Sequence, residues 1–116
     1  MTLLSPELRA QLLKFRNDRD WSQFHNPRTL SAALSVEAAE LLEHFIWAKD
    51  DDLPTLVAGR RDEIEADMAD IAILLEYLCH DLGVDLSTAV VRKLALNAEK
   101  YPVEKARGRS EKYTRL

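Results

Sequence analysis

"RRDEIEADMADIAILLEYLCHDLG", residues 60–83, decides the fold class of this chain. Its apolar residues recur at the three- and four-residue spacing of a helix for about five turns. They are Ile64, Met68, Ile71, Leu75, Leu78 and Leu82. Gly83 follows at once, and glycine is the residue that most often ends a helix. We therefore predict a long helix that starts at about Arg60 and ends at Gly83.

Three other helices are predicted from their end signals. Ser5 and Asn26 each precede a proline, a pair typical of an N-cap followed by the first helical residue. The helices that they start should reach about Asp18 and about Ala48. A fourth helix should follow the cap residue Asp85 and end near residue 100, because Pro102 cannot continue it.

The remaining segments carry no helical or strand-like period. Residues 49–59 are expected to form a charged, proline-containing connection, and the tail after residue 102 to be extended or irregular. The sequence thus predicts one all-α domain over residues 1–116, a four-helix bundle with an irregular basic C-terminal tail.

Composition and charge exclude several classes of protein. The 116 residues contain one cysteine and no run of 18 apolar residues, so neither a disulfide framework nor a membrane span is expected. The N-terminal stretch lacks the pattern of a signal peptide, which favours a cytoplasmic location. Residues 1–91 carry a balance of −9 and residues 92–116 one of +5. The acidic body disfavours nucleic acid, while the basic end could hold a small polyanion.

Acidic residues stand where the helical patterns call for apolar ones. With Asp67 set to 0° on a helical wheel, Asp70 lies at about 300°. Five apolar residues of the same helix lie at about 20–80°, namely Ile64, Ile71, Leu75, Leu78 and Leu82. Glu37 and Glu40 have the same two positions on the wheel of the preceding helix. Buried carboxylates need partners, since dehydrating an unpaired charge is costly.

Antiparallel packing of these two helices would bring four carboxylates together. Such a cluster requires cations, protons or basic partners, and oxygen ligands suit Mg²⁺, with Mn²⁺ as a substitute. Iron is disfavoured because the chain has no Glu-x-x-His, and His44 is expected at an interface rather than as a ligand. The alternative is that both acid pairs are merely solvated helix faces.

Two further groups of residues could bind a substrate. Lys93, Asn97 and Lys100 share one helix face and could contact phosphate oxygens. Trp21, Phe24, His25 and Trp47 could line a pocket for a flat ring, although such residues are more often part of a core or an interface.

The segments "RDWSQFHNPRTL", "EAAELLEHFIW", "DMADI" and "KLALNAEKYPVEKARGRSEKYTRL" resemble the MazG-like all-α nucleoside triphosphate pyrophosphohydrolases, and among these the dCTP pyrophosphatase branch. The resemblance implies Mg²⁺-dependent hydrolysis of a nucleoside triphosphate to the monophosphate and pyrophosphate. It implies metal binding by Glu37, Glu40, Asp67 and Asp70, although the family usually has Glu at the position of Asp67.

The same resemblance assigns substrate contacts. It places Lys93, Asn97, Lys100 and Tyr101 on the phosphate and sugar side, and Trp21 and Trp47 in the base pocket. The animal dCTP pyrophosphatases have His where Leu12 stands and Tyr where Leu74 stands, which leaves the preferred base open. The resemblance also implies a homodimer or homotetramer whose active sites are shared between neighbouring subunits.

These expectations lead to one hypothesis and one rival. The hypothesis is a house-cleaning enzyme acting on dCTP or on modified or non-canonical dNTPs, with Lys93 stabilising developing charge and Glu43 as a possible water-orienting base. The rival is a non-catalytic helical oligomer that binds nucleotides or a protein partner and uses its acids only for structural cations.

Overall fold

A computed structural model describes residues 4–116. Residues 1–3, the start of the stretch that we compared with a signal peptide, lie outside the described residues. The described chain is all-α and has no strand, as predicted. Over these residues it has six α-helices rather than the four predicted.

The α-helices differ widely in length. They are α1 (Pro6–Asp18), α2 (Pro27–Glu43), α3 (Leu53–Gly59), α4 (Arg61–Leu82), α5 (Leu86–Lys100) and α6 (Val103–Ala106). Three short 3₁₀ helices accompany them, namely η1 (Ser22–Phe24), η2 (Asp50–Asp52) and η3 (Tyr113–Arg115).

The predicted caps form. The Oγ of Ser5 accepts a hydrogen bond from the backbone N–H of Leu8 at 3.2 Å. Asn26 and Thr29 form a reciprocal capping box, with side-chain to backbone distances of 2.9 and 3.0 Å. Gly83 ends α4 in the left-handed region at φ 66°, where a Cβ would be strained.

The two unpredicted helices and one wrong helix end have local causes. We expected residues 49–59 to be a charged, proline-containing connection, but Pro54 lies in the first turn of α3, where a missing N–H has no helical partner to lose. Helix α6 is a single turn after Pro102, too short to produce a period. Helix α2 ends at Glu43 rather than at Ala48. The four residues that follow are His, Phe, Ile and Trp, which have lower helix propensity than Ala or Leu, and they form turns instead.

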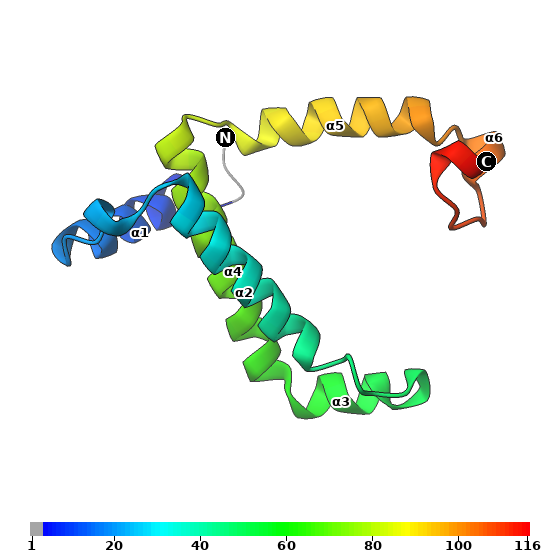
Figure 1. Ribbon diagram of the computed structural model, residues 1–116, viewed down its shortest axis with the longest axis horizontal. Coiled ribbons are helices and arrows are strands. Elements are labelled where there is room, and N and C mark those ends of the chain that lie inside the picture. Colours follow the sequence, from blue (N-terminus) through cyan, green and yellow to red (C-terminus); the bar gives the residue numbers. More distant parts are fainter. Residues whose placement is uncertain (1–3) are drawn as a thin grey trace. The chain divides into compact units, whose positions relative to one another are not determined.

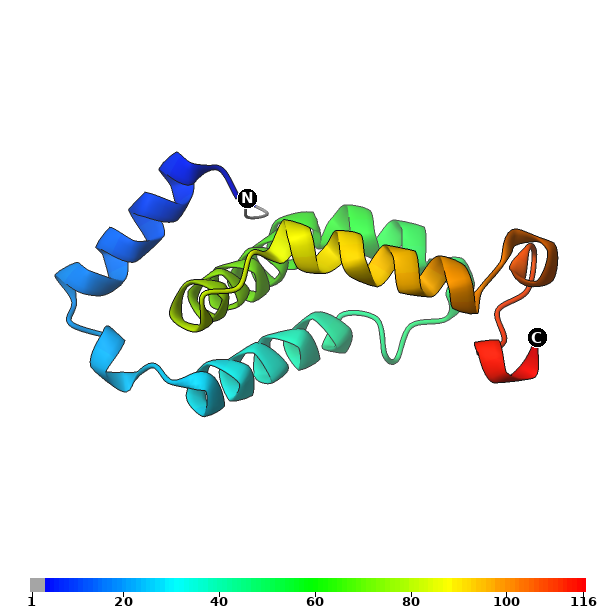
Figure 2. The same ribbon diagram turned by 90° about the horizontal axis from the view of Figure 1, so that it is seen from above.

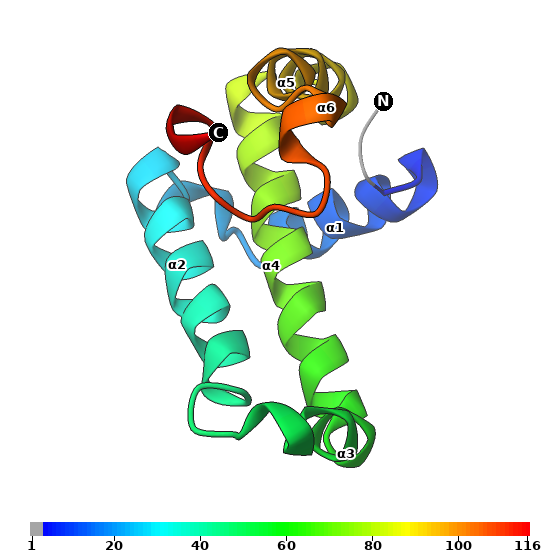
Figure 3. The same ribbon diagram turned by 90° about the vertical axis from the view of Figure 1, so that its right-hand side faces the viewer.

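The described chain forms two compact units, Leu4–Val84 and Asp85–Leu116. In the first, which we call the N-terminal unit, α2 and α4 run antiparallel side by side and α3 lies in the connection between them (Figures 1 and 3). Helix α1 packs against α4 and leads through η1 into α2. In the second, the C-terminal unit, the straight helix α5 is followed by α6 and η3 (Figure 2).

The core of the N-terminal unit is small and centred on α4. Leu30 of α2 and Ile64, Tyr77 and Cys79 of α4 are its buried apolar side chains. Leu30 is 1% exposed, and burial of a leucine side chain stabilises a fold by about 1.5–3 kcal/mol. Among residues 4–116 we find no helix whose length and hydropathy would let it cross a membrane.

Candidate functional site

Three carboxylates from α2 and α4 converge in the N-terminal unit. Glu37, Asp67 and Asp70 each offer one oxygen, and these oxygens all lie within 4.8 Å of one another. Asp67 and Asp70 are three residues apart and so share a face of α4, while antiparallel packing brings Glu37 of α2 opposite them. The sequence predicted this meeting from the two matching wheel positions.

The electrostatics of this acid cluster favour a bound cation. One carboxylate oxygen of Glu37, Oε2, is buried and has no hydrogen-bond partner. A hydrogen bond shared with the Glu40 carboxyl, then burial and the charges of Glu40, Asp70 and Asp67, raise the pKa of Glu37. A buried orphan oxygen among like charges is stabilised by a positive ion, so the residues present fit a hard divalent cation with oxygen ligands.

The other two predicted acids lie at the margin of the cluster. Glu40 is exposed and is not one of the three convergent carboxylates, although its carboxyl group contributes to the raised pKa of Glu37. Glu43 is exposed and is the last residue of α2. The geometry thus brings three of the four predicted metal ligands together and leaves the fourth as their neighbour.

His44 is a partner of the cluster that the sequence analysis placed at an interface. Its Nε2 lies 2.6 Å from Oδ2 of Asp67, and both side chains are largely buried. Aspartate has a short side chain, and His44 reaches that of Asp67 from the end of α2. The sequence signal that could have placed His44 near the acid cluster is its spacing of four residues from Glu40, which puts both on one side of the helix.

A cavity of about 490 Å³ adjoins the cluster. Glu37 and Asp70 belong to its lining, so carboxylates occupy one part of the wall. The rest comes from α1, from the two residues that flank η1 and from the C-terminal half of α4. These other lining residues are Leu8, Gln11, Leu12, Phe15, Trp21, His25, Ile73, Leu74 and Tyr77. The volume falls within the range of about 300–1,000 Å³ usual for small-molecule sites.

The aromatic part of the wall is held by specific contacts. Phe15 and Trp21 pack edge to face, with ring centroids 5.7 Å apart. The guanidinium of Arg19 lies 3.7 Å from the centroid of the Phe15 ring. The Tyr77 hydroxyl donates to the carbonyl of Leu12 at 2.9 Å. Flat aromatic and aliphatic surfaces of this kind suit a planar ring.

The predicted base-pocket residues are found in different places. Trp21 and His25 line the cavity, as do Leu12 and Leu74, the two apolar positions that the sequence analysis singled out. Trp47 follows α2, is 90% exposed and is not part of the lining.

The predicted phosphate-side residues belong to the C-terminal unit. Lys93, Asn97 and Lys100 lie on α5, and Tyr101 is its C-cap. The ammonium of Lys100 lies 4.9 Å from the ring centroid of Tyr113, and Tyr101 packs edge to face on the same ring. Tyr113 therefore contacts Lys100 and Tyr101, the last two of the predicted phosphate-side residues.

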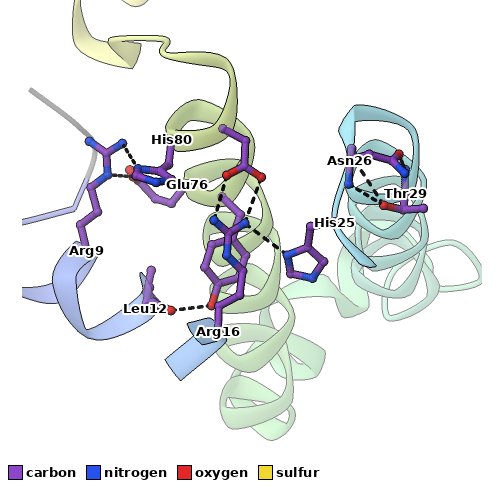
Figure 4. A network of polar contacts seen from close by, with 10 residues as sticks. Arg9, Leu12, Arg16, His25, Asn26, Thr29, Glu76 and His80 are labelled. Atoms are coloured by element: carbon purple, nitrogen blue, oxygen red, sulfur yellow. Dashed lines mark hydrogen bonds and ion pairs between the residues drawn. The ribbon is translucent and has the colours of Figure 1, made fainter. Parts of the chain in front are cut away.

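A buried polar network behind the cavity was not predicted (Figure 4). Arg16 of α1 is 4% exposed and forms two hydrogen bonds with Asp81 of α4, at 2.8 and 2.9 Å. Arg16 follows Leu8 and Leu12 at intervals of four residues, so it continues the apolar face of α1. The position of Arg16 on this apolar face is the sequence signal from which burial of its charge could have been predicted.

Comparison with known proteins identifies the family. The model of the MazG-like family matches residues 32–116, which include all three convergent carboxylates. The chain belongs to the MazG-like family. A crystal structure of a pyrophosphatase from Archaeoglobus fulgidus superposes with a TM-score of 0.80 at 38% identity, covering 83% of this chain and 90% of that one.

Curated relatives of this MazG-like protein are similar along most of its sequence. The dCTP pyrophosphatase 1 of Rattus norvegicus is 39% identical over 113 residues, and that of Homo sapiens is 37% identical over 112. Each alignment covers 95% of this chain and 66% of the relative. The chain thus spans about two thirds of the length of these enzymes.

Proposed function

We propose that this MazG-like protein is a nucleoside triphosphate pyrophosphohydrolase, which releases the monophosphate and pyrophosphate. One observation carries the proposal: Glu37 and Asp70 belong both to the acid cluster and to the wall of the apolar cavity. A cation at the acids can hold a phosphate chain while the aromatic wall takes a ring joined to it. A nucleotide has both parts, and the names of the relatives and of the solved structure point to the same chemistry.

Glu37, Asp67 and Asp70 would hold Mg²⁺, or Mn²⁺ in its place, with Glu40 as a fourth ligand or as the partner of Glu37. When bound, the cation would neutralise phosphate charge and lower the pKa of a water molecule bound to it. Glu43 remains our candidate for orienting that water.

Substrate binding is assigned by the same proposal. Trp21 and His25 would contact the base, while Lys93, Asn97, Lys100 and Tyr101 would contact the phosphates and sugar. Lys93 would also stabilise charge on the leaving group. The wall near Leu12 and Leu74 is apolar and leaves the preferred base open. The substrate class proposed is therefore kept broad: dCTP or modified and non-canonical dNTPs.

A second copy of the chain is the proposed partner. Val36, Leu42 and Ile46 are exposed large apolar side chains of α2 and of the turn after it, and Trp47 is almost fully exposed beside them. Large exposed apolar patches often mark an interface with another chain. We propose a homodimer or homotetramer in which Trp47 contributes to a neighbour's base pocket, with no nucleic acid or membrane involved. The cytoplasmic location stays a prediction.

A panel of canonical and modified dNTPs, analysed by chromatography with Mg²⁺ or Mn²⁺, tests the activity. We expect monophosphate and pyrophosphate in equal amounts, and at least a hundredfold loss of turnover in Asp70→Asn. Glu65→Gln is the matched control, because Glu65 is an exposed acid of the same helix that pairs with Arg61. Absence of turnover with every substrate, together with metal-independent nucleotide binding in Glu40→Gln, would favour the non-catalytic oligomer.

A further inference from the structure

Arg16 is held rigidly at the back of the cavity. Both terminal nitrogens of its guanidinium bond to Asp81, and the group lies 4.7 Å from the centroid of the Tyr77 ring (Figure 4). Bidentate pairing of this kind fixes the orientation as well as the charge. Arg16 therefore has one conformation from which to contact a third group.

That third group is His25, which lines the cavity. Nη1 of Arg16 lies 3.3 Å from Nδ1 of His25 (Figure 4). A guanidinium can only donate hydrogen bonds, so Nδ1 of His25 accepts and carries no proton. The proton of the neutral imidazole is then on Nε2.

The surroundings of His25 keep its ring neutral. Burial and the positive charge of Arg16 lower its pKa, and the charge of Asp81 opposes them only in part. Tyr77, the other titratable group against the ring at a centroid distance of 5.4 Å, donates its hydroxyl proton to a backbone carbonyl. The acids Glu37 and Asp70 line the same cavity.

Much of the cavity wall is apolar, and it includes Leu12, Phe15 and Leu74. The other side-chain donors in the lining are the amide of Gln11 and the indole N–H of Trp21, because the Tyr77 hydroxyl is already used. Within residues 4–116 no acceptor is bonded to Nε2 of His25. This N–H is thus available to a bound molecule.

We propose that Arg16 is a positioning residue that fixes His25 as an Nε2–H donor for an acceptor on the substrate base, a ring carbonyl or an unprotonated ring nitrogen. The proposal rests on the proposed function insofar as the cavity takes a base. Asp81 acts one step further back, because it holds the guanidinium that selects the tautomer.

Nitrogen NMR of the whole protein labelled with ¹⁵N-histidine tests the tautomer without any substrate. We expect His25, assigned with His25→Gln, to show an unprotonated Nδ1 and a protonated Nε2 throughout pH 6–8. In Arg16→Met the pKa of His25 should rise, because the charge of Arg16 is gone while that of Asp81 remains, and the preference for the Nε2–H tautomer should be lost. Arg19→Met is the matched control, since Arg19 is the C-cap residue of the same helix and contacts the Phe15 ring instead.

Two results would overturn the proposal. One is a wild-type His25 that is protonated on Nδ1 or is an imidazolium at pH 7. The other is a spectrum that Arg16→Met leaves unchanged. If Arg16→Met does not fold, as judged by circular dichroism, the wild-type spectrum decides alone.

Kinetics of two conservative variants test the donor role. A glutamine amide reaches the place of Nε2, whereas an asparagine amide reaches only that of Nδ1. His25→Gln should retain KM within about threefold, and His25→Asn should raise KM about tenfold with kcat little changed. Equal KM values in the two variants would overturn the inference, whereas absence of turnover in the wild type would contradict the proposed function and leave the NMR result standing.

Discussion

Nε2 of His44 lies 2.6 Å from Oδ2 of Asp67, and this contact joins the end of α2 to the acid cluster on α4. The imidazole is 13% exposed and the carboxylate 18%, so the contact is shielded from water. A hydrogen bond to one carboxylate oxygen leaves the other free for a cation and limits rotation of the side chain. The shorter Asp67 is thereby held in a defined place.

Removal of this contact should weaken cation binding. In His44→Phe the Asp67 carboxylate loses its anchor, and changes in groups that orient metal ligands lower metal affinity about 10–100-fold. We expect about a tenfold weaker Mn²⁺ affinity, measured by calorimetry or by electron paramagnetic resonance. His80→Phe is the control, because His80 contacts Arg9 at the other end of α4. An unchanged Mn²⁺ affinity in His44→Phe would show that the contact does not orient the ligand.

Much of this fold could be predicted because its signals are local. The ends of α1, α4 and α5 follow from caps and glycine, and these lie within one residue of prediction. The end of α2 was wrong by five residues, because the sequence after Glu43 has a helical pattern of apolar residues but forms turns. Periodicity reports which side chains face a core, not whether the backbone continues as a helix.

The site was predictable only where two helices repeat one pattern. The matching acid pairs predicted that Glu37, Glu40, Asp67 and Asp70 meet, and three of them do, whereas Glu40 lies outside the convergent group. Pairing of Arg16 with Asp81, 65 residues later, depends on how α1 lies against α4, which no local pattern gives. Whether the predicted residues perform the predicted chemistry stays a prediction.

Divalent cations should stabilise the protein. The carboxylates repel one another without a cation, so Asp70→Asn should unfold at a higher temperature than the wild type in the presence of a chelator. Mn²⁺ at about 100 times its Kd should add about 2.7 kcal/mol to wild-type stability and much less to the variant. Thermal unfolding by calorimetry measures both. The idea of a cation site would be wrong if cations shifted both proteins equally.

The pairing of Arg16 with Asp81 should make stability depend on pH in the acid range. The hydrogen bond from Arg16 lowers the pKa of Asp81 below its ordinary 3.8. A carboxylate with a lowered folded-state pKa stabilises the fold above its unfolded pKa, and this stability is lost as pH falls through the folded value. At pH 7, Asp81→Asn should therefore cost about 2 kcal/mol, and the difference from wild type should vanish below the lowered pKa.

Urea unfolding between pH 7 and pH 2 measures this difference. Asp18→Asn is the matched control, because Asp18 forms an exposed i,i+4 pair with Lys14 that contributes little. The assignment fails if the free energies of unfolding of wild type and Asp81→Asn run parallel down to the lowest pH.

Leu30 should be the most sensitive apolar position of the N-terminal unit. It is 1% exposed where α2 packs on α4, and truncation of a buried leucine to alanine costs about 2–5 kcal/mol, with a larger cost for a larger residual cavity. Val36 is on the same helix but 57% exposed, so Val36→Ala should change stability by no more than about 0.5 kcal/mol. Urea unfolding of both variants gives the comparison. A loss below about 1 kcal/mol in Leu30→Ala would mean that α2 and α4 pack less tightly around this position than the structure indicates.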